Sequence, residues 1–580
     1  MKKLYYLRTF YLFVSFLILS SSATKSQDVS EPLMPFLINE YQNDVSDLSK
    51  VYIFHYSDEY FNRFEKFHKD WIEKLKKVDF KKMDVSSQAD YILLKRNIES
   101  DRYELAADKK NFDQVRYAIP FADSIMAMQR KRRRGTTPDA MQWAASLSKV
   151  IEEIQQAKET ITRKPLANND SKKVVITIIK QLRDGLKNVY DFYDGYNPQF
   201  TWWMHKTFPQ TDSSLSSFSK WLAARPVQQQ DVAMDNSGII GHPIGREEIL
   251  RQLKYEMIDY TPEDLIALAE SQYQWCLKQM IQVSKQMGFG DNWKAALEEV
   301  KHHYLPVGEQ PALINQLQEQ AISFIDSLGL VTIPPIAKEA WRMDMLSVKM
   351  MEFASYFLGG SEILVAYPHE DQDFDTKRMI MRSGNFGFAH AEVFHELIPG
   401  HNLQFFMFRR YKPYRRPFNT AFSTEGWPFY WEMTLWDKGF DNTTDEKAGA
   451  LFWRMTRCAR IVFSLNYHLG KWTPQQCIDY LVDKAGLERF SAESEVRRSF
   501  TGGYGPLYQL AYMTGALQLY ALHHEMVTSG KMTDREFNDA YLHNGNIPIE
   551  MFRDILLNQK LPENYSPNWK FIDEVNALIK

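Results

Sequence analysis

Apolar residues recur every three to four positions along most of the 580-residue chain, a spacing that favours amphipathic helices. Several of these runs begin with Thr followed by Pro or acidic residues, as helices often do: Thr261-Pro262-Glu263-Asp264, Thr473-Pro474-Gln475-Gln476 and Thr533-Asp534-Arg535-Glu536. The first run is closed by Gly288, a residue that commonly ends a helix. The pattern therefore predicts a mainly α protein.

Two segments have the composition of extended chain. They are residues 331–335 (Val-Thr-Ile-Pro-Pro) and residues 362–368 (Glu-Ile-Leu-Val-Ala-Tyr-Pro). An acidic, turn-like stretch separates the second segment from Arg378-Met379-Ile380-Met381. We expect 362–368 and 378–381 to form a small β-hairpin or sheet just before the segment at 395–401. Its edge could hold a peptide backbone, or it may serve only to cover the core.

A loop rich in helix-breaking residues, 235–243 (Asp-Asn-Ser-Gly-Ile-Ile-Gly-His-Pro), marks the predicted seam of the chain. It separates an N-terminal helical region, residues 24–240, from a C-terminal region, residues 241–580. We expect the two regions to form one continuous helical fold.

The first 23 residues have the features of a signal peptide. Basic residues precede an apolar run over 9–19, and the small residues at 20–23 suit cleavage after Ala23. The run is too short to span a membrane, and no later segment reaches the ~18 apolar residues that a spanning helix needs. We expect an exported protein, periplasmic or extracellular, without stable membrane insertion after signal removal; an uncleaved N-terminal anchor is the alternative.

Composition and charge exclude several classes of function. The formal charge of -3 gives no global attraction to nucleic acid, and the basic run 130–134, which lacks aromatic neighbours, is typical of a solvated helix end. Cys276, Cys458 and Cys477 do not make a disulfide framework; Cys458 and Cys477 could pair, but free buried thiols are favoured. Serine-hydrolase elbows and phosphate-binding loops do not occur in the sequence.

One short segment carries residues suited to metal-dependent hydrolysis. His395-Glu396-Leu397-Ile398-Pro399-Gly400-His401 offers two imidazoles and a carboxylate that can act as a base. The common spacing places the histidines at i and i+4, whereas i+6 puts them about 240° apart on a regular helix. Because Pro399 cannot donate to the carbonyl of His395, and Gly400 tolerates unusual backbone angles, we expect the helix to break between the histidines.

A third metal ligand lies downstream. Glu425 follows His401 by 24 residues, a separation that two helices and a turn can close. Glu432, two turns further along, is a weaker alternative. We therefore predict a Zn²⁺ site formed by His395, His401 and Glu425, with Glu396 as the general base.

The stretch 395–404, with Glu425-Gly426-Trp427 downstream, resembles the bacterial domain of unknown function 885 family, which is placed among the zincin-like metallopeptidases. That family's pattern is His-Glu-x-x-Pro-Gly-His-x-x-Gln followed by Glu-Gly-Trp-Ala-x-Tyr. The resemblance implies an all-helical zincin-like fold around a deep channel, as in helical oligopeptidases and carboxypeptidases. Pro428 replaces the usual Ala. Residues 457–468 and 506–515 resemble two further elements of the family, with Ser464 where an Asp is usual and Tyr508 where a Gln is expected. These departures bear on specificity before activity.

The remaining candidate residues concern the substrate. A tetrahedral oxyanion needs a donor opposite the metal, and Tyr512 is our first choice, with His468 and Tyr504 behind it. Arg498 is expected to bind a substrate carboxylate, or else to form an internal ion pair with Glu495. The predicted substrate-binding residues are Arg498, Tyr504 and Tyr508.

The predicted function is zinc-dependent hydrolysis of peptides. One alternative is a catalytically inactive helical protein that binds peptides, although Glu396 would be superfluous in a purely structural metal site. The other is zinc hydrolysis of a non-peptide amide or ester, since the metal chemistry is the same. The sequence does not fix the choice between endopeptidase and exopeptidase action, or the oligomeric state.

Overall fold

The computed structural model describes residues 33–228, 235–353, 357–501 and 503–578. The predicted signal peptide, residues 1–23, lies outside these ranges. Within them, every helix is too short or too polar to cross a membrane.

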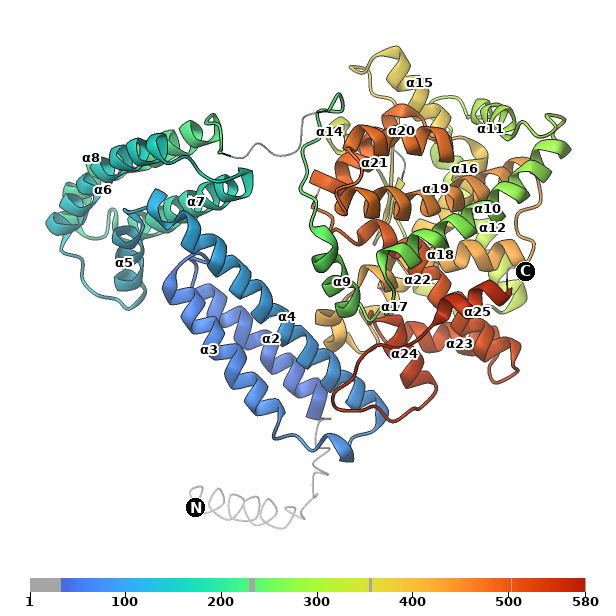
Figure 1. Ribbon diagram of the computed structural model, residues 1–580, viewed down its shortest axis with the longest axis horizontal. Coiled ribbons are helices and arrows are strands. Elements are labelled where there is room, and N and C mark those ends of the chain that lie inside the picture. Colours follow the sequence, from blue (N-terminus) through green and yellow to red (C-terminus); the bar gives the residue numbers. More distant parts are fainter. Residues whose placement is uncertain (1–32, 229–234, 354–356, 502, 579–580) are drawn as a thin grey trace, which may run out of the picture.

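The described chain is helical almost throughout, as the apolar periodicity predicts (Figure 1). The N-terminal helices are α2 (Leu33–Val51), α3 (Asp58–Leu75), α4 (Val85–Val115), α5 (Ala122–Arg133), α6 (Ala140–Arg163), α7 (Asn169–Tyr193) and α8 (Pro198–Ala223). The following helices are α9 (Gly245–Tyr255), α10 (Pro262–Gln286), α11 (Trp293–His302), α12 (Gln310–Leu328), α13 (Pro335–Ala340), α14 (Val348–Met351), α15 (Phe374–Ser383), α16 (Phe386–Glu396) and α17 (His401–Phe408). The last are α18 (Ala421–Asp437), α19 (Thr444–His468), α20 (Pro474–Ala485), α21 (Arg489–Thr501), α22 (Tyr508–His523), α23 (Asp534–Leu542), α24 (Ile549–Leu556) and α25 (Phe571–Leu578). Short 3₁₀ helices are η1 (Phe80–Lys82), η2 (Arg116–Ala118) and η3 (Pro413–Phe418), and η4 (His524–Thr528) is a π-helical segment directly after α22.

The predicted helix starts are confirmed. Thr261, Thr473 and Thr533 each precede a helix, and each accepts a hydrogen bond from a backbone N–H of the first turn. The side chain of the third residue of each helix in turn accepts a hydrogen bond from the backbone N–H of the threonine. These reciprocal bonds satisfy donors that would otherwise lack a partner at the helix end, which explains why the helices begin there.

A small three-stranded sheet lies next to α16. Its order is β1-β3-β2, with β1 (Met343–Met345) parallel to β3 (Ile363–Val365) and β2 (Phe357–Leu358) antiparallel to β3. The predicted strand in 362–368 is therefore confirmed, but its predicted partner is wrong. Residues 378–381 lie inside α15, because the side chain of Asp373 accepts a hydrogen bond from the Thr376 N–H and starts a helix there.

The other segment expected to be extended, 331–335, is irregular rather than a strand. Its apolar residues Val331 and Ile333 are buried in the main core. Pro335 then begins α13, where the missing N–H of a proline costs nothing. All three cysteines are free and buried, so Cys458 and Cys477 are not joined.

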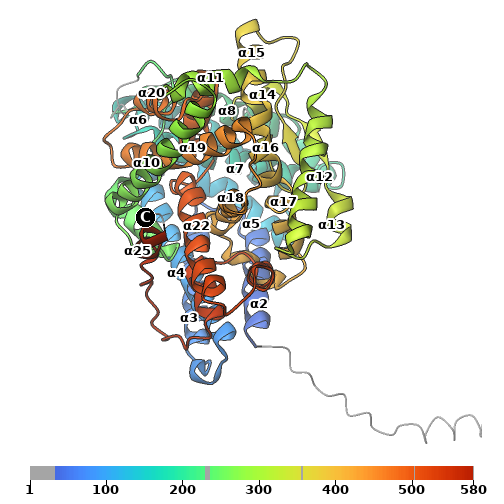
Figure 2. The ribbon, with the colours of Figure 1, turned by 90° about the vertical axis from the view of Figure 1, so that its right-hand side faces the viewer.

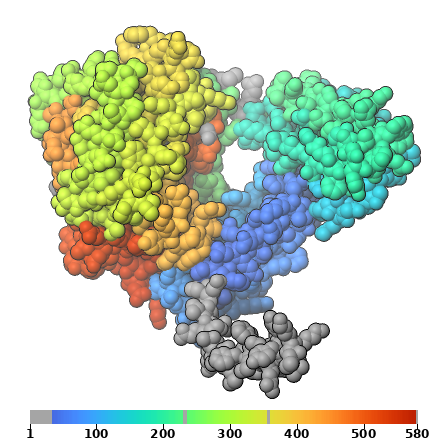
Figure 3. All heavy atoms as spheres, turned by 180° about the vertical axis from the view of Figure 1, so that it is seen from behind, coloured from blue at the N-terminus to red at the C-terminus, as the bar shows by residue number. Residues whose placement is uncertain are grey.

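The N-terminal helices form an arm that leans away from the rest of the chain, here called the body (residues 245–578) (Figure 1). Apolar residues of α2, α3 and the first half of α4 share one core with the body. Helices α5 to α8 pack around a separate core, to which the end of α4 contributes Phe112 and Val115. The predicted seam, 235–243, lies in the connection between α8 and α9. Figure 3 shows an opening between the far part of the arm and the body.

The base of the arm is attached to the body by a buried ion pair. Asp90 of α4 accepts hydrogen bonds from Arg415 Nε at 2.7 Å and from the Tyr414 hydroxyl at 3.0 Å. Both partners belong to η3, the turn between α17 and α18.

The centre of the body is formed by α18 and α22, which pack closely together, with α10 and α12 on opposite sides (Figure 2). Helix α19 packs on both α10 and α16. Because α16, α18, α19 and α22 are buried over nearly their whole length, polar side chains on their facing sides are enclosed. Those enclosed side chains form the candidate site.

Candidate metal centre

The helix that carries the first histidine ends before the second, as predicted. Helix α16 stops at Glu396, the Ile398–Pro399 peptide is cis, and α17 begins at His401. The Gly400 N–H donates to the carbonyl of Phe394 at 3.0 Å, and a Cβ on Gly400 would overlap the carbonyl of His395. Only glycine fits this close approach of two backbone segments.

Two side chains hold the interruption in place. The Gln318 amide donates to the carbonyl of Ile398 at 3.1 Å and accepts from the N–H of the same residue at 3.3 Å. Trp427 Nε1 donates to the carbonyl of Pro399 at 2.8 Å. All the backbone groups involved are buried, where an unmade hydrogen bond is costly. The Trp of the Glu-Gly-Trp sequence therefore fixes α18 against the break.

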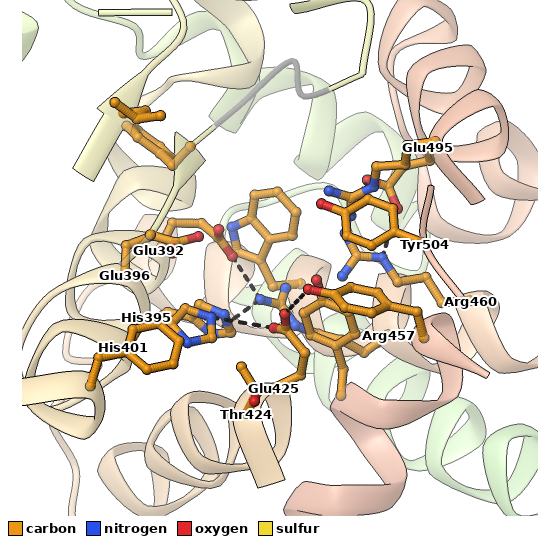
Figure 4. Close-up of a pocket in the computed structure, with 18 residues that line it drawn as sticks. Glu392, His395, Glu396, His401, Thr424, Glu425, Arg457, Arg460, Glu495 and Tyr504 are labelled. Carbon is orange, nitrogen blue, oxygen red and sulfur yellow. Dashed lines mark hydrogen bonds and ion pairs between the residues drawn. The ribbon is translucent and has the colours of Figure 1, made fainter. Parts of the chain in front are cut away.

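This arrangement gathers the predicted metal ligands (Figure 4). Nitrogen and oxygen atoms of His395, Glu396 and His401 lie within 4.8 Å of one another. Glu425 joins the group through its Oε2, which lies 3.3 Å from Nε2 of His401. All four residues are at most 6% exposed, so the group lies in the protein interior.

The unpaired atoms of this group fit a cation. Among the described residues, Glu396 Oε2 and His401 Nδ1 are buried without a hydrogen-bond partner, and Glu425 Oε2 has only the 3.3 Å ion pair with His401. Burying unpaired carboxylate oxygens is costly, and a metal ion would provide their partner. Two imidazoles with carboxylates are the ligands that Zn²⁺ binds in hydrolytic sites.

Glu432 has a different role from the one considered for it as an alternative ligand. Its Oε1 lies 2.6 Å from Nδ1 of His395 and 2.9 Å from a nitrogen of Arg457. Arg457 also donates to Glu392 at 2.8 Å. The contact with Glu432 leaves Nε2 as the nitrogen of His395 that can bind a metal, and it orients the ring.

The charges of the group depend on one another. Burial raises the pKa of Glu396 to about 8. Burial alone would raise the pKa of Glu425 and lower that of His401, but their mutual attraction is stronger. It lowers the pKa of Glu425 to about 2 and raises that of His401 to about 9. In the metal-free protein His401 therefore holds a proton that a metal ion would displace.

These residues line one side of a cavity of about 310 Å³. The other side carries predicted substrate residues, and Figure 4 shows Tyr504 across the cavity from His395. The Tyr508 hydroxyl donates to Glu425 Oε1, and the Tyr512 ring stacks 6.3 Å from the His395 ring. Arg498 also lines the cavity and pairs with Glu495 at 2.6 Å, so the internal ion pair expected as the alternative is present.

His468 is the one predicted site residue that does not line the cavity. It lies at the end of α19, eleven residues beyond Arg457, which is about 16 Å along a helix axis. Its ring packs near Tyr467 and Phe500, and burial lowers its pKa to about 4. Its position therefore does not support the predicted role as an oxyanion donor.

Several cavity residues were missed from the sequence. Arg457 and Arg460 lie about two turns and one turn before Ser464 on α19, and Glu392 lies about one turn before His395 on α16. Helical spacing therefore places each of them beside a position singled out in the sequence. Gly359 gave no such signal. A Cβ at Gly359 would overlap the Glu396 carboxylate, which shows how closely the chain after β2 approaches the candidate base.

Comparison with known proteins gives a family and a fold. A solved structure described as "a putative lipoprotein of unknown function" from Shewanella oneidensis is similar with a TM-score of 0.65 and 16% identity, over 90% of this chain and 99% of that one. A second, "the putative lipoprotein" from Colwellia psychrerythraea, has a TM-score of 0.48 and 16% identity, over 79% and 76% of the two chains. No curated protein matches. The family model described as "Bacterial protein of unknown function (DUF885)" matches residues 52–556, and the chain belongs to that family.

Proposed function

We propose that this protein is an exported, zinc-dependent hydrolase that cleaves peptides, with a zincin-like active site. The single observation that supports this most is the buried group of His395, His401 and Glu425 beside Glu396, whose Oε2 has no hydrogen-bond partner. A structural zinc site is closed by four protein ligands, whereas a hydrolytic one combines three ligands with a nearby base. Two histidines, one carboxylate and a further glutamate match the hydrolytic pattern.

Each side chain then has a defined task. Zn²⁺ held by His395, His401 and Glu425 would lower the pKa of a water molecule towards ~7 and polarise the substrate carbonyl. Glu396 accepts a proton from the attacking water and returns it to the leaving amine. Tyr512, which lines the same cavity, is the proposed donor to the developing oxyanion.

The proposal of export rests on the sequence pattern of residues 1–23 and on the description of the similar structure from Shewanella oneidensis as a putative lipoprotein. Two competing functions remain as alternatives. An inactive peptide-binding protein would keep the cavity without turnover, and a hydrolase of non-peptide amides or esters would use the same metal chemistry on another substrate.

The test combines metal analysis with cleavage of a mixed peptide library, for the wild type, Glu396→Gln and the control Glu159→Gln. Glu159 is exposed on α6 of the arm. We expect stoichiometric zinc in all three proteins and turnover in the wild type and the control only. Turnover by Glu396→Gln would refute the assigned base. Protein that lacks zinc when purified without chelators would favour the peptide-binding alternative, and zinc-loaded protein that cleaves only non-peptide amides or esters would favour the other.

A further inference from the structure

We propose that the cavity binds its substrate by a free carboxyl terminus, held by Arg460 and Arg498, so that the protein removes residues from the carboxyl end of short peptides. This inference rests on the proposed peptidase function and specifies its substrate class.

Two arginines share one carboxylate at this end of the cavity. Arg460 Nε donates to Glu495 Oε2 at 2.8 Å, and a terminal nitrogen of Arg498 lies 2.6 Å from Glu495 Oε1. All three residues are at most 6% exposed. Two guanidinium groups and one carboxylate leave one positive charge without a partner. Because buried charges need partners, this charge favours the binding of a second anion.

Each arginine keeps donors for that anion. Arg498 Nε is buried and has no partner among the residues that the structure describes. The Glu495 contact of Arg460 uses Nε, and its guanidinium lies 4.5 Å from the centre of the Tyr512 ring. A guanidinium has five N–H donors in a planar fork that matches the two oxygens of a carboxylate.

The opposite end of the cavity has the reverse balance of charge. There, Glu392 and Glu432 share the single Arg457 at 2.8 and 2.9 Å, beside the glutamates of the candidate metal group. A cation is therefore favoured near the histidines and an anion near Arg460. Figure 4 shows Arg460 and Glu495 across the cavity from His395, His401 and Glu396.

The two ends are close enough for a short peptide. Tyr512 contacts both, with its ring centre 6.3 Å from that of His395 and 4.5 Å from the Arg460 guanidinium. These distances place the two ends at most about 11 Å apart, and each extended residue adds at most about 3.6 Å, so up to three residues fit between them. The bond presented to Glu396 would then be one of the last three peptide bonds.

Cleavage at that bond is a simple hydrolysis. The water oxygen bonds to the carbonyl carbon, the C–N bond breaks, and the proton taken up by Glu396 passes to the leaving amine. The departing product is a free amino acid, a dipeptide or a tripeptide whose carboxylate is still bound to the arginines.

Binding is tested separately from turnover, in full-length, zinc-loaded Glu396→Gln protein. The probes are an N-acetylated tetra-alanine with a free carboxyl terminus, its carboxyl-terminal amide, and an amide in which the last residue is glutamate. Calorimetry should show the free acid binding about tenfold or more tightly than the first amide, because one charge-assisted contact is lost. The glutamate amide distinguishes a main-chain carboxylate from a side-chain one, and we expect it to bind as weakly as the first amide.

Arginine variants in the same background assign the contact. Arg460→Gln and Arg498→Gln should each weaken binding of the free acid about tenfold and leave binding of the amide unchanged. Arg497→Gln, next to Arg498 on α21 but outside the cavity lining, is the matched control. The acid and amide comparison needs no arginine variant, so it decides the question even if one fails to fold.

Equal affinity for acid and amide would overturn the inference, as would tight binding of the glutamate amide. In the wild type, mass spectrometry should show residues lost stepwise from the carboxyl end, and internal cleavage would also overturn it. If the Glu396→Gln protein binds the free acid selectively but the wild type shows no turnover, the carboxylate site is supported and the proposed peptidase function is rejected.

Discussion

The Nδ1 atom of His395 lies 2.6 Å from Oε1 of Glu432, and the same oxygen lies 2.9 Å from Arg457. The orientation of the imidazole is therefore fixed by a carboxylate that is itself held by an arginine. Such outer contacts typically change metal affinity by about 10 to 100-fold when they are removed.

We accordingly expect Glu432→Gln to weaken zinc binding by about 10 to 100-fold, because the neutral amide holds the histidine less firmly. Competition with a chromophoric chelator measures the dissociation constant. Glu159→Gln, an exposed change in the arm, should leave it unchanged. An unaltered affinity in Glu432→Gln would show that the contact has no part in metal binding.

Gly400→Ala should both destabilise the protein and reduce its zinc content. The new Cβ would overlap the backbone of His395, and forced overpacking of this kind costs about 1 to 3 kcal/mol. Thermal unfolding and elemental analysis give the two results. The control is Gly505→Ala, where a Cβ has open space, and it should match the wild type in both. A stable, fully zinc-loaded Gly400→Ala would contradict the account of the helix break.

Gly359→Ala should affect turnover without affecting folding. A Cβ there meets the end of the Glu396 side chain, which can move aside, and lies 3.0 Å from Cδ2 of His401, a close contact that a small shift of the ring relieves. The melting temperature should stay near that of the wild type, and elemental analysis is needed to show that the zinc content does too. The displaced carboxylate would no longer face its water molecule, and we expect kcat to fall about tenfold or more. Normal kcat in this variant would argue against Glu396 as the base.

The metal-free protein should become less stable as the pH rises from 6 to 9. Burial raises the pKa of Glu396 to about 8, from 4.5, and Glu425 raises that of His401 to about 9, from 6.5, against the effect of burial. A group whose pKa is higher in the folded state contributes stability below its unfolded pKa, and that stability is lost as the pH passes the folded value. Melting curves of metal-free protein across this range test whether the melting temperature falls as the pH rises.

Zinc binding should show the opposite dependence, tightening over the same pH range, because the metal must displace the proton of His401. Chelator competition at several pH values measures the slope. In His401→Gln the slope should decrease. A dissociation constant that does not change with pH in the wild type would mean that His401 is not a ligand.

The sequence was sufficient for features whose cause is local. The helix starts at Thr261, Thr473 and Thr533 depend on residues three positions apart, and the break between His395 and His401 follows from a proline and a glycine inside it. Both can be deduced from neighbouring residues alone, and both were predicted.

Features that depend on contacts between distant parts of the chain could not be predicted from the sequence. The partners of β3 are strands 343–345 and 357–358, and nothing local to 362–368 selects them over 378–381. The choice between Glu425 and Glu432 depends on how α18 lies against α16, which Trp427 fixes through Pro399. His468 was proposed as a donor to the oxyanion but lies at the end of α19, outside the cavity lining, and its distance from the metal ligands depends on the length of that helix.

The arm also has a mechanical consequence. Helix α4 runs unbroken for 31 residues, about 46 Å, from the main core into the core of the arm. It therefore holds helices α5 to α8 at a distance from the main core. Its end in the main core is anchored by Asp90 to Arg415, in the turn that joins the helix of His401 to the helix of Glu425. The length of α4, along which α3 packs, thus contributes to how far helices α5 to α8 stand from the metal ligands.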